Sequence, residues 1–366
     1  MPAPSLSDIN QHLVDGQTDL ALETLKLWAQ SHAPDKLTEV ELQLARLNTS
    51  KSDYFKGLLT REEYTVTLQR INQGVLAFIT EVRTAVSAPA PGAAGDALHE
   101  YHCHTCDRVD QSDTFERIFS SATGKKVHFY YLYGGELQSH EGMFKRIAYD
   151  REGRLLDYLN PELSASCKSL QIELTFDFSR QIDIYKENIV KSFFAALSIP
   201  VNEHEPLLQR NLHYAAERSP KLQGLTARDY VCVNLHISQY DWDTRLTPEA
   251  AGWFITTFSK VALPDDFPTF LFFFAVEYDE ADEDIKTQVE TIVQHSDDIN
   301  ALPELNMVDL RDIGRWFEKY KKIAPTTRER KMLMDEHFKD QQEFYMEDVE
   351  MALLKIIDDY NKRYIR

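Results

Sequence analysis

Cysteine, glycine and long apolar runs are all scarce in this sequence. Its 366 residues include 4 Cys and 13 Gly. So few cysteines exclude a disulfide-stabilised scaffold and predict the reducing cytoplasm as the compartment. No segment reaches the roughly 18 uninterrupted apolar residues that a membrane-spanning helix needs. The first residues carry neither the basic end nor the apolar run of a signal peptide, so we expect neither a membrane anchor nor a signal peptide.

Basic residues are also scarce relative to acidic ones. The chain has 40 Lys and Arg against 59 Asp and Glu, a formal net charge of −19. This balance argues against nucleic acid, because binding to a phosphate backbone depends on Lys and Arg. It argues equally against an anionic membrane surface. The hydrophobic fraction of 43% is that of an ordinary globular protein, and the length predicts about two domains.

One segment divides the chain. Residues 87–98 consist mainly of small residues with Pro and Gly, which cannot build a core and predict a flexible linker. Residues 1–86 precede it and read as a bundle of short helices, because apolar residues recur at helical spacing. These positions include Ile9, Leu13, Leu20, Ala21, Leu25, Trp28, Ile71, Val75 and Ile79.

Residues 99–366 alternate strand-like and helix-like segments, which predicts a parallel α/β sheet followed by a helical C-terminal part. The apolar run 270–276 is typical of a strand buried on both faces. The expected strands are 127–133, 170–178, 230–237 and 270–276. The expected helices are 142–149, 181–196, one from about 247, and then 281–295, 307–321 and 343–363.

The turn after the first strand lies where a P-loop would hold a nucleotide phosphate. A working P-loop needs a second glycine, a lysine for the phosphates and a hydroxyl residue for magnesium. Counted from Gly134, these positions hold Ser139, His140 and Glu141; counted from Gly135, they begin at His140. Because the lysine and the magnesium-binding hydroxyl are missing in either register, we expect a degenerate and vacant site without catalysis.

A second candidate is a metal site in the segment 99–106. His102, Cys103 and Cys106 include a Cys-x-x-Cys pair that could ligate zinc. A structural zinc site needs four ligands, and the sequence holds no second pair at matching spacing. We therefore expect a histidine-rich entry to the domain and no metal, with zinc as the minor alternative.

Two resemblances to known families arise from separate motifs. Residues 5–86 resemble the eleventh type of bacterial effector-associated domain, a death-like adaptor fold, through Leu44-Ala45-Arg46-Leu47-Asn48 and Arg70-Ile71-Asn72. Residues 99–366 resemble the inactive STAND domain of bacterial conflict systems. That resemblance is carried by the segment from Cys106, Asp107 and Arg108 to Gln111 and Phe115, and by Arg146, Leu302-Pro303-Glu304-Leu305 and Trp316.

The resemblances imply a helical death-like bundle joined to a P-loop-NTPase-like α/β domain that has lost its nucleotide chemistry. They imply no enzymatic activity and no cofactor, and a structural or interface role for Cys106, Asp107, Arg108, Gln111 and Arg146. We expect an adaptor in antiviral or conflict signalling that recruits an effector, such as a peptidase, through a matching death-like domain. Lys51, Lys56, Arg61, Glu62 and Glu63 are expected to contribute to that contact.

The α/β domain is expected to bind a sensor or another defence protein, and the reading also allows a homo-oligomer. The first alternative is a switch that binds a nucleotide without hydrolysing it, with Arg108, His140 and Arg146 as the positive groups. The second alternative is a zinc-containing enzyme or module.

Overall fold

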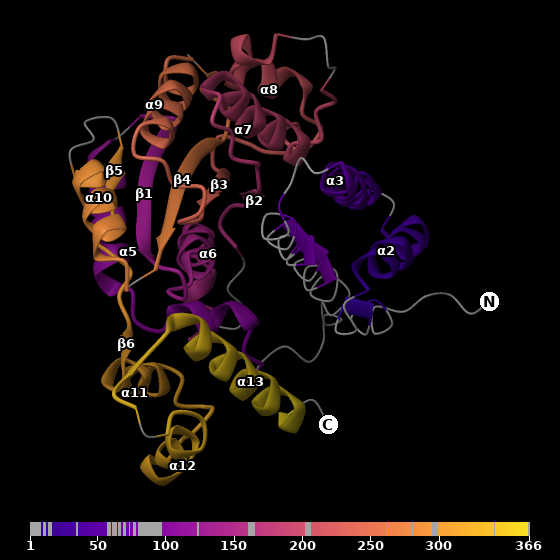
Figure 1. Ribbon diagram of the computed structural model, residues 1–366. Helices are drawn as coiled ribbons and strands as arrows, with labels where there is room; N and C mark the ends of the chain where they lie inside the picture. Colours follow the sequence, from indigo (N-terminus) through magenta and orange to yellow (C-terminus); the bar gives the residue numbers. More distant parts are fainter. Residues whose placement is uncertain are drawn as a thin grey trace. The chain divides into compact units, whose positions relative to one another are not determined.

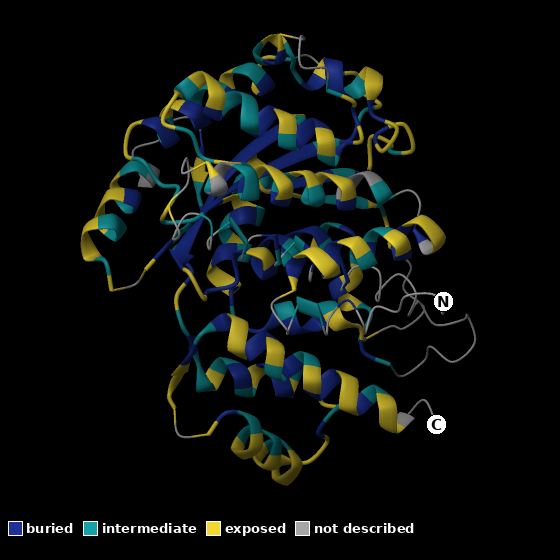
Figure 2. Ribbon diagram, turned by 45° about the vertical axis from the view of Figure 1, so that its right-hand side comes forward, coloured by how far each residue is buried: buried dark blue, intermediate teal, exposed yellow. Residues whose placement is uncertain are grey.

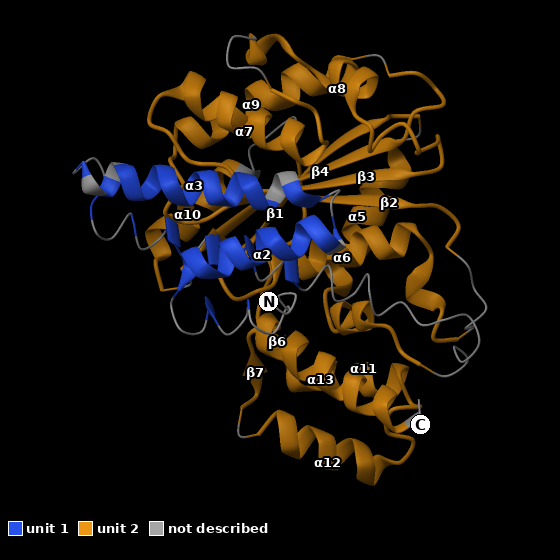
Figure 3. Cartoon of the chain, turned by 90° about the vertical axis from the view of Figure 1, so that its right-hand side faces the viewer, with its two compact units in different colours: residues 1–92 blue, residues 93–366 orange. Residues whose placement is uncertain are grey.

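The chain forms two compact units, residues 1–92 and 93–366 (Figure 3). The structure is a computed structural model. It describes residues 9, 12–13, 17–33, 36–56, ten positions between 60 and 79, and 97–364 except 123, 160–164, 202–205, 262, 280, 295–298 and 340.

The smaller unit is helical where it is described. Its helices α2 (Thr18–His32) and α3 (Leu37–Phe55) pack through an apolar core. The core holds Ile9, Ala21, Leu22, Leu25, Trp28, Ala29, Val40, Leu47, Ile71, Val75, Phe78 and Ile79. One predicted core residue is wrong: Leu20 is 47% exposed. Successive helical residues are rotated by about 100°, so a helix that turns Ala21 inward turns Leu20 away.

Most of the predicted linker lies outside the described residues. Its last residue, Leu98, is buried, and its backbone exchanges two hydrogen bonds with the Asn361 side chain, at 2.9 and 2.7 Å. The larger unit therefore already includes Leu98.

A five-stranded parallel sheet forms the centre of the larger unit, in the order β2-β3-β4-β1-β5 (Figure 1). All four predicted strands are present, but the second ends at Leu174 and not at the predicted 178. The fifth was missed because it is only two residues long and has no pattern of its own. The strands are β1 (Val127–Gly135), β2 (Ser169–Leu174), β3 (Tyr230–Ile237), β4 (Thr269–Tyr278) and β5 (Asn300–Ala301).

Helices cover both faces of this sheet, so the buried strands have apolar residues on both sides (Figure 2). Phe129 and Tyr131 of β1 pack on one face and Tyr130 and Leu132 on the other. The first face carries α7 (Ile182–Ala196), α8 (Leu212–Arg218), α9 (Leu246–Ser259) and α10 (Glu283–Gln294). The second face carries α5 (Val109–Ser121) and α6 (His140–Arg151).

The C-terminal helices build a separate apolar core around Trp316, Phe317 and Tyr320, together with the short helix η2 (Glu100–Thr105). These helices are α11 (Leu310–Lys319), α12 (Thr327–His337) and α13 (Met346–Tyr364). A small antiparallel pair, β6 (Val308–Asp309) and β7 (Glu343–Phe344), joins their ends. The predicted fold class, a helical N-terminal part and a P-loop-like α/β domain with C-terminal helices, is confirmed.

The sequence prediction missed α5, α8 and α12, although Thr326 and Glu329 form a complete capping box at the start of α12. That motif was a readable signal for a helix. In the described part of the chain, no helix combines the length and the apolar character needed to cross a membrane.

Candidate functional site

The turn between β1 and α6 lies at the carboxyl edge of the sheet. β1 ends at Gly135 and α6 begins at His140. Ser139 caps the helix: its Oγ accepts a hydrogen bond from the Gly142 N–H at 3.2 Å, and its backbone is left-handed, with a φ of 52°. The unpaired N–H groups of a first helical turn, together with the helix dipole, favour an anion at this point. A P-loop would place a phosphate here.

The anion at this position is a carboxylate of the protein itself. Glu350 of α13 is buried and accepts a hydrogen bond from Ser139 Oγ at 2.5 Å. Its other oxygen lies 2.8 Å from His104 Nδ1 of η2. A Cβ on Gly142 would collide with the same carboxylate, so the glycine leaves room for it. The C-terminal helices therefore fill the amino end of α6 with their own negative charge.

Further contacts hold α13 against this turn, and the surroundings are acidic. The Glu347 N–H donates to the Leu137 carbonyl at 3.2 Å, and Figure 1 shows α13 beside the lower end of α6. Partial burial raises the pKa of Glu347 to about 7, and the negative charges of four nearby glutamates add to this effect. These are Glu277, Glu350, Glu136 and Glu141. The phosphates of a nucleotide would find the amino end of α6 occupied by the Glu350 carboxylate, and the surrounding glutamates would repel them.

The first glycine of the turn has a packing role. A Cβ on Gly134 would lie 2.6 Å from the Leu305 carbonyl oxygen, and the two residues form an isolated parallel bridge. Only glycine allows the two backbones to approach so closely. Gly134 is therefore explained by Leu305, without a phosphate. Gly135, the last residue of β1, accepts the Gln138 N–H at 3.1 Å and so closes the turn.

His140 does not supply the positive charge that the nucleotide-switch hypothesis needs. Burial lowers its pKa to about 4, so the ring is neutral at pH 7. Its Nδ1 lies 3.5 Å from Glu277 Oε1, and the other Glu277 oxygen lies 2.7 Å from His236 Nε2. Its neighbour Glu141 forms an ion pair with Lys145 one turn further along α6.

The two arginines of that hypothesis are occupied by protein carbonyls. The buried Arg108 donates to the Asn306 carbonyl at 2.5 Å and to Gln138 at its carbonyl and its Oε1, at 3.0 and 3.1 Å. Arg146 donates to the Asp107 carbonyl. These contacts tie the turn to segments on either side of it in the sequence.

The other members of the Cys-Asp-Arg motif have similar internal contacts. Cys106 is fully buried, and Gln111 donates to the Glu304 carbonyl at 2.8 Å. Asp107 and Arg108 are both left-handed, with φ of 51° and 60°. Such backbone costs roughly 1 kcal/mol per residue and persists only where its surroundings impose it. The Asp107 and Arg108 backbone is held by the hydrogen bonds just described.

The zinc candidates belong to a buried network around η2. His102 Nδ1 lies 2.9 Å from the Tyr320 hydroxyl and its Nε2 lies 2.7 Å from Asp157 Oδ1. Cys103 and Cys106 lie in the C-terminal core, where burial raises the pKa of both thiols and so opposes the thiolate that zinc requires. Among the described residues, no group of three His, Cys, Asp or Glu could hold a metal ion.

The smaller unit presents exposed leucines. Leu20 and Leu27 of α2 are 47% and 57% exposed, and Leu42 of α3 is 40% exposed. Of the charges expected to contribute to docking, Lys51 pairs with Asp19, and Lys56 is exposed. The other three, Arg61, Glu62 and Glu63, lie outside the described residues.

Sequence reasoning missed Glu350 and His104 as members of this site. Glu350 lies 211 positions from Ser139, inside the acidic first turns of a helix, where glutamate is common for electrostatic reasons alone. No local pattern distinguishes it from Glu347 or Asp348. His104 was visible only as one of several histidines in the segment 99–106.

Comparison with known proteins supports the two resemblances. Residues 4–83 match the family model of effector-associated domain 11, and residues 104–276 match that of the inactive STAND domain. No curated protein matches the chain. The two families fit a non-catalytic STAND protein that carries an effector-associated domain. The chain thus joins a segment that matches effector-associated domain 11 to one that matches the inactive STAND domain.

Proposed function

We propose that this protein is a non-catalytic adaptor in bacterial antiviral or conflict signalling. Its effector-associated domain recruits an effector, such as a peptidase, that carries a like domain. Its inactive STAND domain binds a sensor or another protein of the same system. The protein acts in the cytoplasm and performs no reaction itself.

The observation that carries this proposal is the Glu350 carboxylate at the amino end of α6. A nucleotide-driven protein leaves this position free for a phosphate, because the helix end is where its binding energy arises. Here Ser139 and His104 bind a carboxylate of the same chain. The contact of Glu350 with Ser139 and His104 therefore holds the C-terminal helices in place, and no nucleotide is needed for it. Such an arrangement suits a scaffold that binds proteins.

The exposed leucines of α2 indicate a recruiting surface. Leu20 and Leu27 lie seven residues apart, about two helical turns, and therefore on the same side of the helix. Apolar side chains exposed together mark contact sites more often than scattered ones do. We propose that this pair contacts the partner's domain, with charges such as Lys56 at the edge.

The test is capture of the effector from extracts of the native host by the tagged full-length protein, followed by mass spectrometry. We expect a captured enzyme with its own death-like domain, and we expect capture to be lost with Leu20→Glu/Leu27→Glu and with deletion of residues 1–86. The matched control is Leu156→Glu/Leu159→Glu, which changes two leucines of the larger unit that are 56% and 69% exposed. Capture that survives the deletion would refute the assignment of roles.

A further inference from the structure

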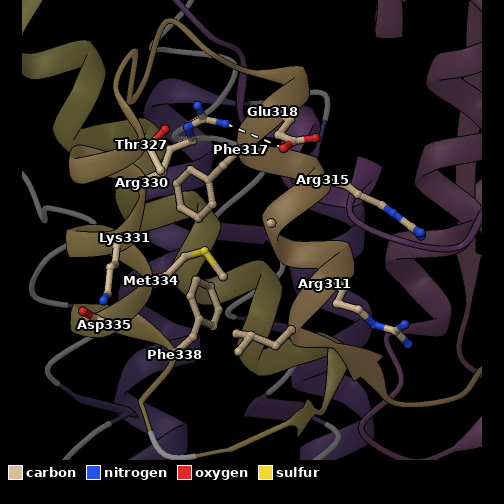
Figure 4. Close-up of a pocket in the computed structure, with 12 residues that line it drawn as sticks. Arg311, Arg315, Phe317, Glu318, Thr327, Arg330, Lys331, Met334, Asp335 and Phe338 are labelled. Atoms are coloured by element: carbon tan, nitrogen blue, oxygen red, sulfur yellow. Dashed lines mark ion pairs between the residues drawn. The ribbon is translucent and has the colours of Figure 1, made fainter.

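An open groove of about 410 Å³ runs between α11 and α12 (Figure 4). Phe317, Met334 and Phe338 form its apolar floor, and in Figure 4 the Met334 thioether lies between the two rings. Gly314 of α11 keeps the groove open because it has no side chain. A Cβ at this position would find Met334 Cε as its nearest neighbour, at 4.0 Å.

Helix α12 carries apolar surface that its own unit does not cover. None of its eleven residues is buried, and Met332 is 60% exposed. Its partly buried Leu333 and Met334 pack against the C-terminal core, so only part of its apolar surface is left open to solvent. Its helical start does not depend on burial, because Thr326 and Glu329 cap it locally.

The rim of the groove is basic in a chain that is otherwise acidic. Residues 310–339 hold nine Lys and Arg against five Asp and Glu, a net charge of +4, while the rest of the chain carries −23. Four basic residues, Arg311, Arg315, Arg330 and Lys331, line the groove against two acidic ones, Glu318 and Asp335.

Several of these rim charges already have partners, but the pairs are weak. Arg311 and Arg315 pair with Asp309 and Asp312, and their own side chains are 82% and 75% exposed. Ion pairs at such exposure contribute little to stability, so carboxylates of another molecule can replace them. Arg330 lies 3.8 Å from Glu318, and Figure 4 shows this pair at the upper end of the groove.

We propose that this α11–α12 groove is the docking site for an acidic amphipathic helix of a partner protein. The apolar side of that helix lies on Met334 and Phe338, and its carboxylates reach Arg311, Arg315 and Lys331. An amphipathic helix in an apolar groove is a recurring mode of recognition, and the basic rim selects a helix with acidic flanks. A nucleic acid fits less well, because the remaining −23 of the chain repels phosphates.

This inference rests on the proposed function, since it names the surface through which the STAND domain of the adaptor contacts its second partner. The probe is a labelled peptide of about 18 residues with leucines at helical spacing and glutamates on the other side. Binding to the full-length protein is followed by fluorescence anisotropy. A scrambled peptide of the same composition and a single-stranded oligonucleotide serve as comparisons.

We expect a Kd below about 100 µM for the amphipathic peptide at low salt. The variant Arg311→Glu/Arg315→Glu weakens it by about tenfold or more, because two attractions become repulsions. The variant Gly314→Phe fills the groove without changing a charge and weakens it to a similar extent. The matched control Lys221→Glu/Arg228→Glu reverses two exposed charges elsewhere in the same unit and changes the Kd by less than about twofold.

Three results overturn the inference: no binding of the amphipathic peptide, equal binding of the scrambled peptide or the oligonucleotide, and no effect of Gly314→Phe. Circular dichroism of each variant verifies that the protein is folded. Effector capture through residues 1–86 is measured in the same variants. If it persists while the peptide does not bind, the groove proposal fails and the adaptor proposal survives.

Discussion

The contact between Glu350 and Ser139 gives the sharpest prediction, because it joins the C-terminal helices to the amino end of α6. Glu350→Ala removes a charge-assisted hydrogen bond of 2.5 Å, worth about 1.5–3 kcal/mol. It also removes an anion at a helix N-terminus, worth about 0.3–2 kcal/mol. Some of this sum is offset, since a buried carboxylate no longer has to be desolvated. We expect a loss of about 2–4 kcal/mol in the free energy of unfolding.

A second variant separates charge from shape. Glu350→Gln keeps the volume and an acceptor for the Ser139 hydroxyl but removes the charge, so the expected loss is about 1–2 kcal/mol. Ser139→Ala completes a double-mutant cycle with Glu350→Ala, and the expected coupling energy is about 1–2 kcal/mol.

The assay is urea unfolding of the full-length chain followed by tryptophan fluorescence. A Trp28→Phe background confines the signal to the larger unit, because the other three tryptophans, Trp242, Trp253 and Trp316, lie there. If Glu350→Ala lies within about 0.5 kcal/mol of the parent, or if the coupling energy is zero, the carboxylate does not hold the C-terminal helices on α6 and the reasoning is refuted.

Four further predictions concern the same unit. Isothermal calorimetry with ATP, GTP and their diphosphates, with and without magnesium, is expected to give no binding heat; a saturable heat would restore the nucleotide switch. Gly314→Ala is expected to stabilise the protein by about 0.5–1 kcal/mol. Gly142→Ala places its Cβ against Glu350 and is expected to destabilise the protein by about 1–3 kcal/mol. If thermal melts show the melting temperature changing in the same direction for both variants, the geometry of one of the two sites is wrong. Burial lowers the pKa of His140 to about 4 in the folded chain. As the pH falls below about 6.5, this histidine becomes protonated in the unfolded chain but stays neutral in the folded one. Unfolding stability should therefore drop by about 2 kcal/mol from this residue between pH 7 and pH 5, and His140→Gln should reduce the drop by that amount in urea titrations at the two pH values. Metal analysis of the purified protein is expected to find zinc near zero, and one zinc per chain would revive the metal hypothesis for His102 and the two cysteines.

Secondary structure was predictable for most segments that carry their own pattern, although α5 has one and was not predicted. The apolar run at 270–276 and the aromatic run at 127–133 read as strands because buried parallel strands are apolar on both faces. The two-residue strand β5 carries no pattern and forms only because β1 lies beside it. Helix α12 was missed for a different reason: none of its residues is fully buried and its apolar residues are few, so its capping box is its clearest signal.

The roles of single residues were less predictable, because they depend on neighbours distant in the sequence. Gly134 sits where a phosphate glycine would, yet Leu305 explains it. His140 looks like a cation in the sequence, yet burial makes it neutral. Leu20 looks like core, yet it is exposed by its rotation on α2.

The sequence by itself determined the two-part organisation, the α/β class and the absence of the P-loop lysine and hydroxyl residue. Each of these follows from composition, periodicity or a missing residue, which are local properties. Only the tertiary structure decided what occupies the amino end of α6. A carboxylate and a helix end attract each other through space, so residues 211 positions apart can meet. Neither segment then needs a local sequence pattern that predicts the contact. The same holds for the α11–α12 groove, whose basic rim gathers residues from two helices that the sequence does not place side by side.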